Sequence, residues 1–96
     1  MAILEQLTFG IGEIEEVFKE LIDLGVNEIT LCRYLHSMIL DEGKELYYNW
    51  LEENAERLVD DYMLVNGTNS IDESKYLPVL VLIINEYVAW LDSKFK

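Results

Sequence analysis

Residues 76–91, YLPVLVLIINEYVAWL, decide the fold class of this chain. Their first half is continuously apolar and rich in β-branched residues, as a buried strand is, so strand and helix both have to be considered. The apolar pattern continues to Leu91 over about 15 residues, which is long for a strand, and the sequence offers no second strand for pairing. We therefore predict a helix that begins near Lys75, with Pro78 in its first turn, where proline costs little. Because nearly every side of it is apolar, we expect this helix in a bundle centre or against another chain.

Before this segment, apolar residues recur at steps of three and four, which is the spacing of one helix face. A first helix is predicted with the apolar positions Leu4, Leu7, Ile11, Ile14, Phe18 and Leu21. Gly10 and Gly12 each cost up to about 1 kcal/mol relative to Ala, so this helix bends at them or begins near Gly12. It is expected to end at Gly25 in a left-handed cap that brings Val26 against Leu21.

Two further helices complete an all-α fold, a small antiparallel bundle of three to four helices in one domain, residues 1–96. The second follows Asn27 as its N-cap and ends near residues 41–43. It carries Ile29, Cys32, Leu35 and Ile39 on one side, with Leu31, Tyr34 and Met38 beside them. The third covers about 44–65, with the inner positions Tyr47, Leu51, Ala55, Leu58, Tyr62 and Val65. A loop at 66–70 and a short turn at 71–75 precede the last helix.

The composition combines acidity with enough apolar residues for a core. The 96 residues include 19 Asp and Glu against 7 Lys and Arg, a net charge of -12, yet 51% are hydrophobic. A disordered chain is therefore excluded, and a single cysteine excludes a disulfide scaffold or a zinc finger with paired cysteines. The first residues do not resemble a secretory signal, and the longest apolar stretch is about half of a membrane span. We expect a cytoplasmic protein.

No motif in the sequence points to catalysis. Cys32 and His36 lie four residues apart on one helix, so they supply at most half of a zinc site and do not converge as a nucleophile and base. Arg33 occupies the position three residues before His36, so the Glu-x-x-His pattern of di-iron bundles is absent. Phosphate-binding loops, nucleophile elbows and His-Glu-x-x-His are absent as well. We expect no enzyme activity, cofactor or metal.

The same charge balance argues against direct binding to nucleic acids or membranes. The seven basic residues are scattered along the chain, and a net charge of -12 repels phosphate groups. No basic amphipathic helix of the kind that lies on a membrane surface is present.

The acidic residues are concentrated in the first two thirds of the chain. Residues 1–60 hold 14 acidic and 4 basic residues. Two predicted helices carry acidic ridges, composed of Glu13, Glu16, Glu20 and Asp23 on the first and of Glu45, Glu52, Glu56 and Asp60 on the third. Like charges at i,i+4 cost roughly 0.2–0.5 kcal/mol each, so a surface selected for stability alone would alternate its signs.

Two aromatic residues, Tyr48 and Trp50, flank the inner stripe of the third helix. Either Trp50 packs on the next helix, or both residues are exposed anchors surrounded by Glu45, Glu52, Glu53 and Glu56. Exposed ion pairs contribute little each, so a docking surface needs such anchors. Phe9 lies off the stripe of the first helix and is a further unplaced aromatic residue.

We therefore expect a non-enzymatic protein that occludes the basic surface of a protein partner, such as a nucleic-acid-handling enzyme. In size and charge the chain resembles bacteriocin immunity proteins and phage anti-defence proteins, including anti-CRISPRs and DNA mimics; composition alone carries this resemblance. The expected contact residues are Glu13, Glu16, Glu20, Asp23, Glu45, Tyr48, Trp50, Glu52, Glu53, Glu56 and Asp60. One alternative is a structural or adaptor subunit that forms a homodimer through the C-terminal helix, in which the acidic residues only confer solubility. Another is a metal-dependent enzyme that uses Cys32 and His36.

Overall fold

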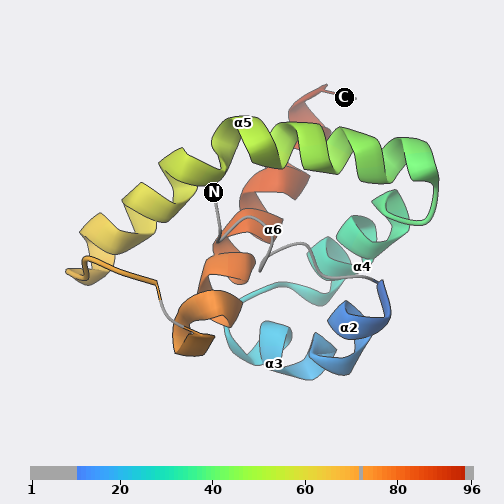
Figure 1. Ribbon diagram of the computed structural model, residues 1–96. Coiled ribbons are helices and arrows are strands. Elements are labelled where there is room, and N and C mark those ends of the chain that lie inside the picture. Colours follow the sequence, from blue (N-terminus) through green and yellow to red (C-terminus); the bar gives the residue numbers. More distant parts are fainter. Residues whose placement is uncertain (1–10, 72, 95–96) are drawn as a thin grey trace.

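The computed structural model describes residues 11–71 and 73–94, and these residues form helices without any strand. Their order is α2 (Ile11–Glu16), α3 (Phe18–Asp23), α4 (Glu28–Ser37), α5 (Asp41–Asn66), the one-turn 3-10 helix η1 (Glu73–Lys75) and α6 (Tyr76–Lys94) (Figure 1). The all-α prediction is confirmed.

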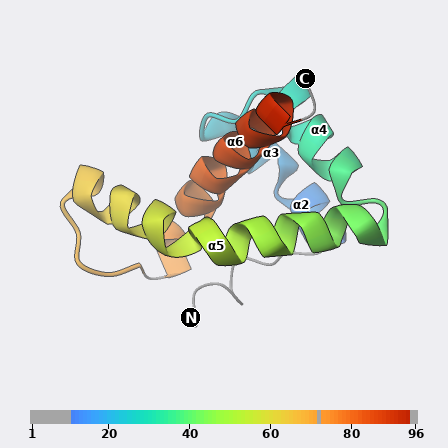
Figure 2. The same cartoon turned by 90° about the horizontal axis from the view of Figure 1, so that it is seen from above.

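Helix α6 lies in the centre of the bundle and packs against α3, α4 and α5 (Figures 1 and 2). Its buried residues are Val79, Leu80, Ile83, Ile84, Tyr87 and Val88. The helix follows η1 directly and has Pro78 as its third residue, as predicted. The side of α6 that carries these buried residues is thus covered by α3, α4 and α5. Helix α6 is long and apolar enough to cross a membrane, but core helices of globular proteins pass the same test of length and composition.

The predicted first helix is divided into α2 and α3. The break lies at Val17, whose backbone leaves the helical region at φ -105° and ψ 15° and whose N–H donates to the Ile14 carbonyl at 3.2 Å. Ile14 on α2 and Leu21 on α3 are both fully buried. The sequence predicted either a bend at the glycines or a helix start near Gly12; Gly12 lies within α2, and the break comes after it, at Val17. Gly10 and the predicted positions Leu4, Leu7 and Phe9 lie outside the described residues.

The two predicted caps around residues 25–27 are confirmed. Gly25 has a φ of +121°, the Val26 N–H donates to the Leu21 carbonyl at 3.0 Å, and Val26 is buried. This is the Schellman closure expected after Leu21. The Asn27 side-chain oxygen then accepts the Ile29 N–H at 2.8 Å and caps α4.

The connection between α4 and α5 lies earlier in the chain than predicted, because α4 ends at Ser37 and α5 begins at Asp41. Leu40 has an extended backbone before α5. Gly43 packs so closely on the end of α4 that a Cβ there would lie 1.8 Å from the Ser37 carbonyl oxygen. Gly43 lies in the first turn of α5. The sequence predicted the end of the second helix at this position.

Of the two neighbouring apolar sides that the sequence gives α4, the one with Leu31 and Tyr34 is buried. Leu31, Tyr34 and Met38 are buried, whereas Ile29 is 71% and Ile39 is 60% exposed, and Cys32 is exposed too. Leu35, on the same side as Ile29 and Cys32, is half-buried and packs against the core, so only part of this side is outer surface.

Helix α5 covers the bundle with a buried face formed by Tyr47, Trp50, Leu51, Ala55, Leu58 and Val59. Val65 was predicted on this face and is instead 82% exposed, as is Leu64. The reason is visible in Figure 2, where the end of α5 extends past α6. Tyr62 is half-buried.

Three tyrosines join α4, α5 and α6 in the core. The ring centroids of Tyr34 and Tyr47 are 5.3 Å apart and those of Tyr47 and Tyr87 are 4.8 Å apart, both edge to face. All three hydroxyl groups are buried and have no hydrogen-bond partner of good geometry. Burial raises the pKa of Tyr47 to about 12. Burial, followed by the influence of the neighbouring Tyr47, raises the pKa of Tyr34 well above its ordinary value, and burial raises the pKa of Tyr87 as well.

Candidate functional site

The outer side of α5 carries a continuous acidic face, defined as Glu45, Glu52, Glu53, Glu56 and Asp60. All five side chains are exposed, on an unbroken helix of 26 residues. From Glu45 to Asp60 the face extends over about 22 Å, given the rise of an α-helix per residue. The basic residues of α5, Lys44 and Arg57, approach Asp41 and Asp61 at 4.0 and 3.6 Å. Those two aspartates are not members of the face.

One of the two predicted aromatic anchors lies beside this face and the other does not. Tyr48 is 40% exposed and its ring lies 5.7 Å from that of Tyr47. Trp50 is only 6% exposed, with its ring 5.1 Å from Tyr87 and 6.2 Å from Trp90 on α6. The prediction of Trp50 as an exposed anchor is wrong, and the alternative that it packs on the next helix is confirmed.

Trp50 instead forms part of a small hollow between α5 and the end of α6. The hollow has a volume of about 180 Å³ and is lined by Leu46, Asn49, Trp50, Glu53, Trp90 and Lys94. The Lys94 Nζ lies 4.9 Å from the centroid of the Trp90 ring, the arrangement of a cation–π contact. This hollow was not predicted, because its two walls come from segments about forty residues apart in the sequence.

The other predicted acidic ridge, on the predicted first helix, is interrupted. Its members are exposed, but Glu13 and Glu16 lie on α2 while Glu20 and Asp23 lie on α3, and the chain changes direction at Val17 between the two pairs. In Figure 1, α2 and α3 lie at the bottom of the molecule and α5 at the top, with α4 and α6 between them. The two acidic regions therefore belong to separate faces and do not form one negative wall.

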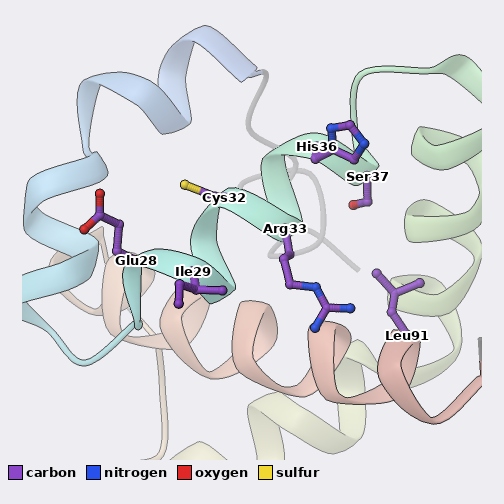
Figure 3. A pocket seen from close by; sticks show the side chains of 7 residues that line it. All are labelled: Glu28, Ile29, Cys32, Arg33, His36, Ser37 and Leu91. Atoms are coloured by element: carbon purple, nitrogen blue, oxygen red, sulfur yellow. The ribbon is translucent and has the colours of Figure 1, made fainter. Parts of the chain in front are cut away.

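A groove follows the outer face of α4. It has a volume of about 640 Å³ and is lined by Glu28, Ile29, Cys32, Arg33, His36, Ser37 and Leu91. Arg33 extends towards α6, which carries Leu91 (Figure 3), and it forms an ion pair with Asp92. The sequence contained a signal for this exposed face, because Glu28, Arg33 and His36 border Ile29 and Cys32 on the helix.

The part of the chain that the structure describes does not gather a set of metal ligands. Cys32 and His36 are both exposed on α4, and no group of three or more His, Cys, Asp or Glu side chains in residues 11–71 and 73–94 is placed to hold a metal ion. The strongly buried Tyr34 and Tyr47 have raised pKa values and stay neutral near pH 7. Comparisons with protein-family models, curated proteins and solved structures found no match for this chain.

Proposed function

We propose that this chain is a non-enzymatic binding protein that places the acidic face of α5 on a basic surface of a protein partner and occludes it. The observation that carries the proposal is the row of exposed carboxylates on one unbroken helix. Glu52 and Glu56, and Glu56 and Asp60, are like charges at i,i+4, each pair costing roughly 0.2–0.5 kcal/mol. A charged surface that lowers the stability of its own helix is typical of a binding surface.

The chemistry of this face suits a partner that ordinarily holds nucleic acid. Carboxylates at i,i+4 recur about every 6 Å along the helix axis, so they present a line of negative charge to lysine and arginine side chains. Such a field accelerates association with a basic protein and does so most at low ionic strength. Nucleases and other nucleic-acid-handling enzymes carry basic surfaces of this kind, which places immunity and anti-defence inhibitors among the candidate classes.

Affinity requires anchors besides charge, and two are adjacent to the acidic face. Tyr48 offers a partly exposed aromatic ring. The hollow at Trp90 already accommodates the ammonium group of Lys94 and includes Glu53 of the acidic face. A lysine or arginine of the partner would displace the exposed Lys94 side chain and take its position over Trp90, where the ring and a carboxylate both favour a cation.

The experiment is a binding titration against a panel of purified basic nucleases and nucleic-acid-binding proteins, from low to physiological salt. We expect binding that weakens as salt rises. The triple variant E52Q/E56Q/D60N of this chain should lower the affinity for a partner that binds by about tenfold or more. The matched control, E16Q/E20Q/D23N, removes the same charge from α2 and α3 and should leave affinity nearly unchanged. No salt-sensitive binding in the panel, or equal losses in both triple variants, would contradict the proposal.

A structural or adaptor role is the second candidate function. Only 33% of the most apolar stretch of α6, which motivates it, is buried inside the chain, and the groove beside α4 leaves Ile29 and part of Leu91 accessible. This groove lies on α4 and α6, away from the acidic face of α5, and allows a separate test.

A further inference from the structure

We infer that the outer face of α4 is a self-association surface, on which two copies of this chain pack their α4 helices antiparallel about a two-fold axis beside Cys32. This contact is independent of the acidic face of α5. It uses the groove lined by Ile29, Cys32 and Leu91.

The first argument is the exposed apolar surface. Ile29 is 71% exposed at the groove, and Cys32 is exposed one turn further along α4 (Figure 3). Leu91 contributes from α6 and is half-buried. Contiguous apolar surface of this kind is typical of interaction sites, and a groove beside a helix accepts the side chains of another helix.

The second argument is electrostatic. Two copies that each carry a net charge of -12 repel each other, so they associate only through a face that is locally close to neutral. The groove has one carboxylate in its lining, Glu28, together with Arg33 and His36. The nearby Asp92 carboxylate is paired with Arg33. The outer sides of α2, α3 and α5 are acidic in comparison, so they are poor surfaces for a second copy.

The third argument is the symmetry of the polar groups about Cys32. Glu28 lies four residues before Cys32 and His36 lies four residues after it, so all three share one side of α4. In an antiparallel helix pair with a two-fold axis beside Cys32, Glu28 of each copy faces His36 of the other. An isologous interface repeats each contact twice. The opposite ends of the α4 face thus complement each other, which selects a second copy as the occupant of the groove.

The test measures the mass of the full chain in solution by light scattering and sedimentation equilibrium as its concentration is raised. We expect the apparent mass to increase twofold from the 11.2 kDa of one chain. Ile29→Glu should restore the mass of one chain. Leu64→Glu is the matched control, because Leu64 is 82% exposed at the far end of α5, and it should leave the twofold mass unchanged. Circular dichroism of both variants verifies that the helices are intact.

The register is tested by charge exchange and by cross-linking. Glu28→Lys and His36→Glu should each weaken the dimer, and the double variant should restore it, because the lysine of each copy then faces the glutamate of the other. Cys32 is the single cysteine of the chain, so a short bis-maleimide should join two copies, and Ile29→Glu should abolish this product. A chain that stays monomeric at high concentration, a dimer that survives Ile29→Glu, or a double variant without recovery would each overturn the proposal. A monomer would leave the groove to an unrelated protein or a small apolar ligand.

Discussion

The ring of Tyr47 on α5 meets the ring of Tyr87 on α6 edge to face, with centroids 4.8 Å apart. Tyr34 of α4 contacts both rings, at 5.3 and 6.2 Å. Such pairs contribute about 0.5–1.5 kcal/mol beyond the burial of their area. The three buried hydroxyl groups oppose this gain, because a buried donor without a partner costs roughly 1–3 kcal/mol. The centre of the bundle therefore combines favourable ring packing with unsatisfied polar atoms.

Tyr47→Phe tests this balance. The substitution keeps the ring contacts and removes one buried hydroxyl, so we expect the free energy of unfolding to rise by about 1 kcal/mol. Urea denaturation followed by circular dichroism measures it. The control is Tyr48→Phe, whose exposed hydroxyl should change stability by no more than about 0.5 kcal/mol. A stability loss in Tyr47→Phe would show that the hydroxyl is hydrogen-bonded in solution.

The same tyrosines predict loss of stability at high pH. Burial raises the pKa of Tyr47 from 10.0 to about 12 in the folded chain, and Tyr34 is shifted in the same direction. Between these values the unfolded chain loses protons that the folded chain retains, so the free energy of unfolding falls as pH rises. The contribution is fully present below pH 10 and is lost by up to about 1.4 kcal/mol per pH unit for each tyrosine above it.

Urea denaturation at increasing pH, together with the absorbance of tyrosinate, measures this effect. Tyr47→Phe should show a shallower decline above pH 10, because one of the shifted groups is absent. The same slope in the variant and in the parent chain would assign alkaline unfolding to other groups, such as the lysines.

Neutralising the acidic face of α5 should raise stability while it weakens partner binding. Glu52→Gln combined with Glu56→Gln relieves the i,i+4 repulsions between Glu52 and Glu56 and between Glu56 and Asp60. We expect a gain of about 0.5 kcal/mol in the free energy of unfolding at low salt, which high salt reduces. Glu86→Gln, an exposed change on α6, serves as the control and should be nearly neutral. A stability loss in the double variant would indicate that these carboxylates stabilise α5 through contacts of their own.

Local chemistry made the helices and their caps predictable from the sequence. The cap at Gly25 and the N-cap at Asn27 depend on residues within one or two turns, and both are confirmed. The break at Val17 and the early start of α5 were not predicted. The start of α5 depends on how this helix packs on the end of α4, as the contact of Gly43 with Ser37 illustrates.

The faces of the helices were harder to assign than the helices themselves. Two apolar stripes compete on α4, and the one that contains Tyr34 is buried because Tyr34 packs against tyrosines of α5 and α6. Val65 continues the inner stripe of α5 but has no helix beneath it. The acidic face of α5 was predictable, since charged residues are seldom buried. The groove beside α4 and the hollow at Trp90 were not predictable, because each is formed by two segments that are distant in the sequence.

Gly43→Ala provides the sharpest test of the connection between α4 and α5. A Cβ at this position would lie 1.8 Å from the Ser37 carbonyl oxygen, which is backbone and cannot rotate away. The start of α5 must then shift, and we expect the free energy of unfolding to fall by about 3 kcal/mol. Gly12→Ala is the matched control, because Gly12 lies in α2 with open space around its Cβ position, and it should stabilise the chain by about 0.5–1 kcal/mol. Urea denaturation of the two variants compares them directly. Equal stability of Gly43→Ala and the parent chain would mean that α5 does not pack on the end of α4 in solution.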